Sequence, residues 1–302
     1  MKATRLHAYG DIDQFKYEDV PAPALGAGEI LVEIKASSLN PVELYIRQGY
    51  LAQMAPLEMP AILGLDLAGI VAAVGASATG FKVGDRVIGK LPIHGKGTNA
   101  EWVVAAPEHL ARLADNVSFI DGAALPLAGL AGQQAVDALG VKAGDRVLVT
   151  GALGAVGRVA VQYLKELGAI PVAGVLASRL DEAKALGVDA LAIDEPAERG
   201  SFDAVVATVG GTVASAAIEL VRDGGVLAAL AGLPEGANAD GRIKTIDVLA
   251  IEDAMILQRV ADAAASGKLS IPVAKTLPLS EVGEGHKLLA AGQLKGKIVL
   301  VP

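Results

Sequence analysis

Three glycines at a spacing of three residues mark the segment RVLVTGALGAVG, residues 146–157, as a place for chemistry. Gly151 follows a short apolar run, and apolar residues at helical spacing follow Gly157. An early glycine in such a turn permits a sharp reversal, a second lets the backbone approach a pyrophosphate, and a third allows the helix to pack closely on the strand. The free N–H groups at the start of the helix then face the anion. The segment therefore predicts a dinucleotide-binding loop.

The elements on either side of the loop help to distinguish a dinucleotide-binding loop from a turn that binds nothing. Ala152 stands at the first position of the usual G-x-G-x-x-G pattern, so the match is to a variant of that pattern. A strand–turn–helix without a ligand would also accommodate the glycines. A strand before the loop, a helix after it and a surrounding strand–helix–strand unit favour dinucleotide binding.

The end of the next predicted strand indicates which dinucleotide is bound. NAD-binding chains carry Asp or Glu there, about 20 residues after the loop, to hold the ribose 2′-hydroxyl. This chain reads VLASRLDE, with Ala177, Ser178 and Arg179 in that place. The first acid, Asp181, comes one helical turn later. A hydroxyl and a forked, permanently charged guanidinium suit a 2′-phosphate, so we expect NADPH rather than NADH.

Helix capping is an alternative role for Ser178. Serine is a good N-cap residue, and Asp181, three positions later, would complete a pair that resembles a capping box. Both roles are compatible for Ser178, whereas capping does not explain Arg179.

The two parts of the chain differ in their pattern of predicted elements. From residue 1 to about 116 it has short apolar runs between Gly and Pro, which predict a barrel-like β domain. From about 140 to 233, strands and helices alternate, which predicts a parallel sheet with helices on both faces. The expected strands are 146–150, 170–176, 190–193, 202–208 and 224–231, and the expected helices are 156–167, 180–186 and 213–221. The tail from about 270, with a helix at 279–291 and a strand at 297–301, is expected to pack on the first domain.

Composition and charge exclude several classes of protein. The chain has 302 residues and is 52% hydrophobic but only 3% aromatic, which is typical of layered α/β cores. A net charge of −8 without a Lys/Arg-rich stripe argues against nucleic-acid binding. The uncharged stretches are too short to span a membrane, and the N-terminus has no apolar region typical of a signal peptide. We therefore expect a cytoplasmic protein without a membrane partner.

The side chains that commonly bind metals are scarce. The chain has no cysteine, which excludes disulfides, iron–sulfur ligation, a thiolate nucleophile and Cys-based zinc sites. The histidines His7, His94, His109 and His286 are scattered without ligand-like spacing. We expect them to be surface or hydrogen-bonded residues, and we expect no metal site.

Several segments, in this order and spacing, resemble the zinc-independent branch of the medium-chain dehydrogenase/reductase superfamily, close to the quinone oxidoreductases and zeta-crystallin. They are SSLNPVELYIRQG at 37–49, PAILGLDLAGIVAAVG at 60–75, GDRVIG at 84–89, AALPLAGL at 123–130, GDRVLVTGALGAVG at 144–157 and GKIVLVP at 296–302. The resemblance implies an α/β fold with a Rossmann-type doubly wound parallel sheet domain plus a GroES-like β-barrel catalytic domain. It divides the chain into a GroES-like part (1–120), an NADP-binding Rossmann domain (121–265) and a C-terminal segment that returns to the catalytic domain (266–302).

The positions that bind zinc in zinc-dependent relatives can be compared with this chain one residue at a time. Zinc-dependent relatives carry Gly-His-Glu where this chain has Gly64, Leu65 and Asp66, and a leucine cannot bind zinc. Without a metal to polarise a carbonyl, the implied activity is NADPH-dependent reduction of an acceptor that is already electrophilic. Quinones, and alkenes conjugated to a carbonyl, fit that need. The alternative is an NADPH-binding sensor or structural protein, which is conceivable because Ala131 and Gln133 stand where relatives often have Thr and Trp.

The resemblance also implies the residues of the site and a homodimer. Asn40 and Tyr45 are the expected catalytic residues, near the nicotinamide and the substrate; Tyr45 would donate a proton or only orient the substrate. The alternatives are a turn residue for Asn40 and a wall residue of an amphipathic segment for Tyr45. The expected cofactor-binding residues are Gly151, Ala152, Leu153, Gly154, Ala155, Val156, Gly157, Ser178, Arg179, Thr208, Val209, Gly210, Leu230, Ala231 and Gly232.

Overall fold

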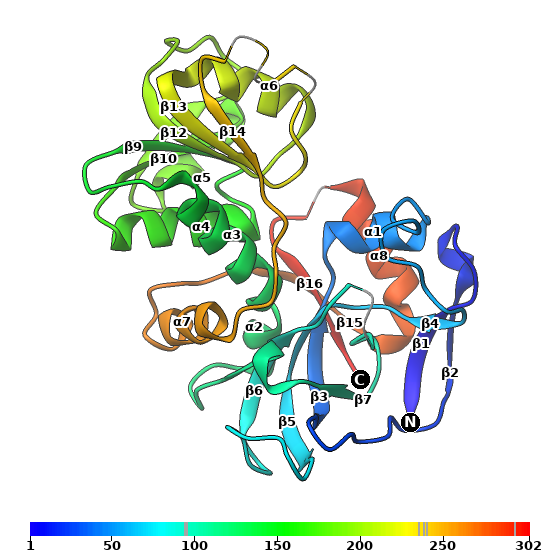
Figure 1. The fold of residues 1–302 in the computed structure, drawn as a ribbon. Helices are drawn as coiled ribbons and strands as arrows, with labels where there is room; N and C mark the ends of the chain where they lie inside the picture. The colour runs from blue at the N-terminus through cyan, green and yellow to red at the C-terminus, as the bar shows by residue number, and fades with distance from the viewer. Residues whose placement is uncertain (94–95, 235, 238, 240, 293) are drawn as a thin grey trace. The chain divides into compact units, whose positions relative to one another are not determined.

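The computed structural model describes residues 1–302 except 94–95, 235, 238, 240 and 293 (Figure 1). The chain forms two compact units: one contains Met1–Leu127 and Glu252–Pro302, and the other contains Ala128–Ile251. His94 lies outside the described residues. The division into a catalytic part, an NADP-binding part and a returning segment at 120 and 265 stays a prediction.

The unit Ala128–Ile251 is built on a six-stranded sheet in which every neighbouring pair is parallel. Its spatial order is β11-β10-β9-β12-β13-β14. Counted from the first strand of the sheet, this is the order 3-2-1-4-5-6 of a doubly wound dinucleotide-binding sheet, in which ligands bind at the carboxyl ends of the strands. The strands are β9 (Arg146–Thr150), β10 (Ile170–Val175), β11 (Asp189–Ala192), β12 (Phe202–Ala207), β13 (Val221–Ala229) and β14 (Lys244–Asp247).

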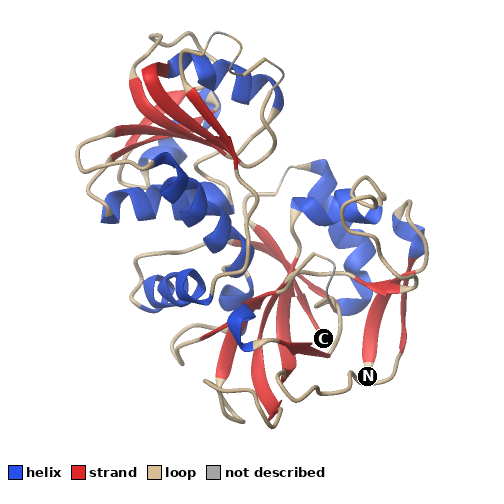
Figure 2. Ribbon diagram, in the orientation of Figure 1, coloured by secondary structure: helices blue, strands red, loops and turns tan. Residues whose placement is uncertain are grey.

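Helices cover both faces of this sheet because its central strands are apolar on both sides. Val147 and Val149 of β9 point into a core formed with the first three helices of the unit, whereas Leu148 points into a second core with α6. Figure 2 shows these helices on the two sides of the strands. The helices are α3 (Pro126–Leu139), α4 (Ala155–Glu166), α5 (Leu180–Lys184) and α6 (Gly211–Leu220).

The predicted elements of this unit are present, with shifts at some ends. The strand predicted from 224 begins at Val221, and the helix predicted to end at 186 ends at Lys184. The edge strand β14 was not predicted, because its short sequence KTID has no buried residue and gives no apolar signal. No helix among the described residues is long and apolar enough to cross a membrane.

The other unit contains two sheets. The larger has the order β15-β16-β3-β5-β6-β8, with β7 also paired to β3, and the smaller has the order β2-β1-β4. The strands are β1 (Lys2–Leu6), β2 (Phe15–Asp19), β3 (Ile30–Ser38), β4 (Ala61–Ile62), β5 (Asp66–Val74), β6 (Arg86–Lys90), β7 (Trp102–Ala105), β8 (Leu110–Arg112), β15 (Val273–Pro278) and β16 (Lys297–Val301). The sequence analysis did not identify β1 and β2.

The C-terminal strand β16 is an internal strand of the larger sheet. It pairs antiparallel with β3, with Val299 opposite Ser38. This pairing brings the start of β16 next to the segment that follows β3, where helix α1 begins. The helices of this unit are α1 (Pro41–Arg47), α2 (Phe119–Ala123), α7 (Ala254–Ala265) and α8 (Val282–Ala291).

Candidate cofactor and active site

The glycine loop between β9 and α4 leaves no room for side chains at two of its three glycines. Gly151 has a left-handed backbone (φ 61°), and a Cβ there would lie 2.5 Å from Thr208 Oγ1. A Cβ on Gly157 would lie 2.4 Å from the carbonyl oxygen of Gly151 and 2.6 Å from the Cα of Ala152. Gly157 therefore lets the first turn of α4 contact the loop directly, as the sequence pattern requires.

The third glycine, Gly154, is exposed and stands at the N-cap position of α4. A Cβ there would meet only the Gly151 carbonyl oxygen, at 3.2 Å. The N–H groups of the first turn, from Ala155 to Gly157, have no carbonyl partner within the helix, and no side chain caps this end. An exposed backbone with free donors at a helix N-terminus fits the pyrophosphate of a dinucleotide.

The ends of β9, β12 and β13 bring further predicted residues to the same edge of the sheet. Thr208 Oγ1 donates to the Thr150 carbonyl oxygen (2.7 Å), and Thr208 N donates to Thr150 Oγ1 (3.2 Å). A Cβ on Gly210 would lie 2.9 Å from the carbonyl oxygen of Ala231. The segments 208–210 and 230–232 thus lie in contact beyond the strands, and 208–209 contact the glycine loop. The sequence analysis did not identify Thr150.

The residues after β10 form a 3-10 turn, Ala177–Arg179, before α5. Ser178 is exposed, and Arg179 forms a two-point ion pair with Glu182, with Nη2–Oε1 at 2.9 Å and Nε–Oε2 at 3.2 Å. The predicted capping pair of Ser178 and Asp181 is wrong. The 3-10 turn moves the helix start to Leu180, no side chain caps it, and Asp181 pairs with Lys184 at 3.3 Å.

A buried polar cluster lies in the other unit, around the carboxylate of Asp66. Asp66 Oδ2 accepts from Ser38 Oγ (2.9 Å), Asn40 Nδ2 (2.9 Å) and Lys297 Nζ (3.2 Å). Its Oδ1 accepts from the Leu127 N–H at 2.8 Å. We call Ser38, Asn40, Asp66 and Lys297 the Asp66 cluster. Each member is less than 10% exposed, so every charge in it depends on a partner within the protein.

The Asp66 cluster engages both ends of the Asn40 amide. Its oxygen accepts from Lys297 Nζ at 2.5 Å while its nitrogen donates to Asp66, and only 4% of the residue is exposed. Tyr45, on α1, is 53% exposed, and its ring centroid lies 6.3 Å from that of Tyr50. Of the two predicted catalytic residues, Tyr45 therefore has a side chain that a ligand can reach. The catalytic roles of both stay predictions.

Two buried titratable groups lie beside the cluster. Glu43 Oε1 accepts from the N–H of Asn40 (3.0 Å), whereas its Oε2 has no hydrogen-bond partner among the described residues and lies 4.0 Å from His286 Nε2. Burial, together with the charge of Asp66, raises the pKa of Glu43 to about 8. Burial, together with the nearby Arg47, lowers the pKa of His286 to about 3. The expectation that His286 is a surface or hydrogen-bonded residue is wrong, because it is fully buried and neither ring nitrogen has a hydrogen-bond partner in the described part of the chain.

These two groups predict how stability depends on pH. Between pH 4.5 and about 8, folded Glu43 holds a proton that the unfolded side chain has lost, so its contribution to stability falls as the pH rises. Between about 3 and 6.5, folded His286 lacks a proton that the unfolded ring binds, so its contribution rises with pH. The two contributions oppose one another between pH 4.5 and 6.5, and above pH 6.5 only that of Glu43 still changes with pH.

Glu43→Gln should remove the alkaline loss. From pH 6.5 to 8 the wild type should lose up to about 2 kcal/mol more unfolding free energy than the Gln variant, because each pKa unit corresponds to about 1.4 kcal/mol. Urea unfolding followed through Trp102, the single tryptophan and a residue of the same unit, measures this difference. Equal pH slopes for the two proteins would contradict the proposed protonation of Glu43.

The residues at Gly64, Leu65 and Asp66 do not fit a zinc ion. Leu65 offers no donor atom, and the carboxylate of Asp66 is occupied by the ammonium of Lys297 and by neutral donors. Within the described part of the chain, no group of three or more His, Cys, Asp or Glu side chains could hold a metal ion.

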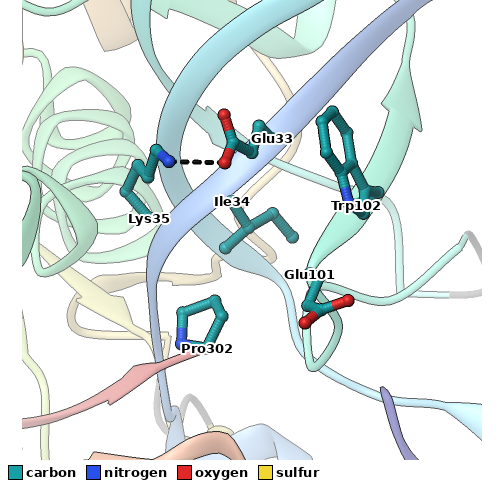
Figure 3. A pocket seen from close by; sticks show the side chains of 6 residues that line it. All are labelled: Glu33, Ile34, Lys35, Glu101, Trp102 and Pro302. Carbon is teal, nitrogen blue, oxygen red and sulfur yellow. Dashed lines mark hydrogen bonds and ion pairs between the residues drawn. The ribbon is translucent and has the colours of Figure 1, made fainter. Parts of the chain in front are cut away.

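A surface pocket of about 330 Å³ lies elsewhere in this unit, against β3 and β7 (Figure 3). Figure 3 shows the Lys35 ammonium turned toward the carboxylate of Glu33, 2.5 Å away. None of the predicted site residues lines this pocket, and we assign it no role. Its lining residues are Glu33, Ile34, Lys35, Glu101, Trp102 and Pro302.

Comparison with known proteins places the chain in a family. The model of the alcohol dehydrogenase GroES-like domain matches residues 26–115, and that of zinc-binding dehydrogenases matches 175–300. The 2-methylene-furan-3-one reductase of Solanum lycopersicum is 32% identical, over 100% of the chain and 79% of that protein. The chain belongs to the medium-chain dehydrogenase/reductase family. The resemblance inferred from the sequence motifs is thereby confirmed, and so is the fold with GroES-like and Rossmann parts.

Other members of the family resemble the chain over its full length. The NADPH-dependent alkenal/one oxidoreductase of Arabidopsis thaliana is 29% identical, over 100% of the chain and 80% of that protein. The solved quinone oxidoreductase of Coxiella burnetii superposes with a TM-score of 0.91 at 27% identity, over 100% of the chain and 99% of that structure. The chain is therefore an oxidoreductase with the fold of a nicotinamide-dependent enzyme.

Several polar residues of the two regions were not predicted from the sequence. Glu43 follows Asn40 by three positions, which is the capping-box spacing and could have indicated a helix start at 41. Lys297 precedes the apolar run IVLV, and a charge at the edge of a buried strand is a signal for a buried partner. Glu182 follows Arg179 by three positions, a spacing at which opposite charges pair on a helix.

Proposed function

We propose that this oxidoreductase is an NADPH-dependent, metal-free reductase that passes hydride to a quinone or an α,β-unsaturated carbonyl compound. The observation that carries this proposal is the carboxyl edge of the parallel sheet. There, the exposed Gly154 backbone starts α4, and Ser178 and Arg179 follow β10, the strand that pairs with β9. The segment 177–179 itself contains no acid, and the Asp194 carboxylate that reaches it is engaged by the N–H of Ala177 at 2.8 Å. The names of the relatives, which are reductases of enones, alkenals or quinones, support a reductase and not the alternative of a sensor or structural protein.

In this proposal the protein binds and orients while the cofactor carries the reaction. The bound nicotinamide would supply the hydride. The loop Gly151–Gly157 and the first turn of α4 would hold the pyrophosphate, and Ser178 and Arg179 would hold the 2′-phosphate. Segments 208–210 and 230–232 would orient the nicotinamide. Tyr45 would donate a hydrogen bond or a proton to the substrate oxygen as negative charge develops on it.

The proposed acceptor must be electrophilic by itself, because nothing at the zinc position of relatives can polarise a carbonyl. Leu65 has no donor atom, the sequence has no cysteine, and Asp66 is held by Lys297. A quinone, or an alkene conjugated to a carbonyl, accepts hydride and yields an anion whose charge is spread over an oxygen. A single donor such as the Tyr45 hydroxyl can stabilise such an anion.

The choice of NADPH is tested by calorimetric titration with both cofactors. We expect the wild type to bind NADPH more tightly than NADH, and Arg179→Ala to weaken NADPH binding by about 1.5–3 kcal/mol while leaving NADH unchanged. Arg199→Ala is the matched control, because Arg199 forms an exposed ion pair with Glu219 in the same unit. Equal affinity of the wild type for the two cofactors would refute the 2′-phosphate assignment.

A homodimer in the cytoplasm completes the proposal. The dimer is what the family resemblance implies, and the cytoplasmic location is the expectation from the sequence, in which the uncharged stretches are too short to span a membrane. Sedimentation equilibrium should give twice the mass of 30.5 kDa. A mass equal to that of one chain at micromolar concentration would refute the dimer.

A further inference from the structure

Arg158 is a second arginine at the carboxyl edge of the parallel sheet, in addition to Arg179. It follows Gly157 directly in the first turn of α4, and it is partly buried. Its Nε donates to the carbonyl oxygen of Leu153 at 3.1 Å, so the guanidinium is held against the glycine loop. This contact uses the Nε donor of Arg158, and the terminal nitrogens of the guanidinium can donate to another acceptor.

Arg158, Arg179 and Glu182 share one electrostatic neighbourhood. Burial lowers the pKa of Arg158, the charge of Glu182 acts against that shift, and the positive charge of Arg179 acts with it. The three groups therefore carry one net positive charge, although Arg158 comes from α4 and the other two come from the segment after β10. That segment is where the 2′-phosphate of a dinucleotide is read in this type of fold.

The carboxylate of Glu182 accepts hydrogen bonds from the Arg179 nitrogens that would otherwise donate to a phosphate. Its two oxygens take Nε and Nη2 of Arg179, which is the same planar fork that binds a phosphate at two points. Both side chains are about one-third exposed, 34% for Arg179 and 33% for Glu182, so the pair can open toward water. Exposed pairs of this kind contribute little to stability, and a phosphate with about two charges can replace the carboxylate.

We propose that Arg158 and Arg179 bind the 2′-phosphate of NADPH together, and that Glu182 is an internal counter-ion which the phosphate displaces. This inference rests on the proposed function, because it concerns how the same cofactor is selected. In the free protein Glu182 keeps the Arg179 fork ordered. In the complex its carboxylate must turn away, because it would otherwise lie beside a dianion. Glu182 therefore lowers the affinity for NADPH, whereas Arg158 raises it.

The test uses the full chain and titrates NADPH, NADH, adenosine 2′,5′-bisphosphate and 5′-AMP into the wild type, three test variants and one control variant. Glu182→Gln should tighten NADPH and the bisphosphate at least threefold, because it removes the competing charge. Arg158→Gln should weaken the binding of NADPH and of the bisphosphate about tenfold. The affinities of Arg158→Lys should lie between those of the wild type and of Arg158→Gln. NADH and 5′-AMP, which lack the 2′-phosphate, should not change. Glu219→Gln, in the exposed pair with Arg199, is the matched control and should leave all four ligands unchanged.

The outcomes separate this inference from the function on which it rests. If the wild type does not prefer NADPH, the proposed cofactor is wrong, whatever the variants do. If the wild type prefers NADPH but Arg158→Gln and Arg158→Lys bind it as the wild type does, the role of Arg158 is overturned. If Glu182→Gln weakens NADPH binding, Glu182 is a support for Arg179 and the displacement is overturned. Unchanged melting temperatures, together with unchanged NADH binding, show that each variant is folded.

Discussion

Lys297→Met should lower the free energy of unfolding by about 3–5 kcal/mol, because removal of one partner leaves a buried charge uncompensated. The Lys297 ammonium contacts both Asp66 Oδ2 and Asn40 Oδ1, and it is 7% exposed. Methionine fills a similar volume but cannot donate to either oxygen. Asp66 would keep only neutral donors, and Asn40 would lose the partner of its amide oxygen. Urea unfolding followed through Trp102 reports on the unit that contains all three residues.

Lys275→Met is the matched control for this substitution. Lys275 lies on β15, the strand next to β16, and its side chain is exposed. The same chemical change there should alter the unfolding free energy by less than about 0.5 kcal/mol. Similar values for the two variants, or a loss below 1 kcal/mol at Lys297, would contradict the account of the Asp66 cluster as a set of mutually dependent charges.

Gly154→Ala and Gly157→Ala should separate cofactor binding from stability. Gly154 is exposed with ordinary backbone angles, so Ala should cost less than about 1 kcal/mol of stability. Its methyl group would, however, stand where the pyrophosphate must approach, and NADPH should bind at least about tenfold more weakly, or 1.4 kcal/mol. At Gly157 the Cβ would overlap backbone at 2.4 Å, so Ala should destabilise the protein by about 1–3 kcal/mol.

Calorimetric titration with NADPH and thermal unfolding of the free proteins measure the two effects. We expect that Gly154→Ala lowers the affinity for NADPH with little change in the free energy of unfolding. We expect that Gly157→Ala lowers the free energy of unfolding. Unchanged NADPH affinity in a folded Gly154→Ala protein would mean that the loop is a turn without a ligand, which is the alternative that the sequence left open.

The sequence predicted the parallel sheet well because its signals are local. The strand at Arg146–Thr150 is predicted without error, and the helix that follows begins within one residue of its predicted start. Each predicted β-strand there is an apolar run that ends at a turn, and the predicted helices have their own periodicity, so no distant contact is needed to recognise them. The glycine spacing located the loop for the same reason.

The Asp66 cluster could not be predicted because its members are far apart in the chain. Lys297 and Asn40 are 257 positions apart, and only the pairing of β16 with β3 brings them together. A sequence shows neither that register nor the burial that makes the partners interdependent. The same limit explains His286, whose environment is set by Glu43 and by the packing of α8 on α1.

The residues proposed to select the cofactor were predicted in part. The position of Arg179 after β10 was visible in the sequence, since it follows from counting residues beyond the loop. The ion pair of Arg179 with Glu182, and the charge of Arg158 near both, could not be predicted in this way, because Arg158 lies on α4 and the pair follows a 3-10 turn that the sequence did not predict. A local pattern therefore leads to the hypothesis of NADPH, and the side-chain geometry leads to the test of it.

Turnover with NADPH tests the central claim most directly. The purified protein, treated with a chelator, should oxidise NADPH steadily with at least one acceptor from a panel of quinones and enones, and NADH should be a poorer donor. The proposed metal-free reaction predicts that the rate does not fall on chelation, since the side chain of Leu65 has no donor atom and Asp66 is engaged by Lys297. Tight NADPH binding without turnover of any acceptor, or activity that disappears with the chelator and returns with zinc, would contradict the account.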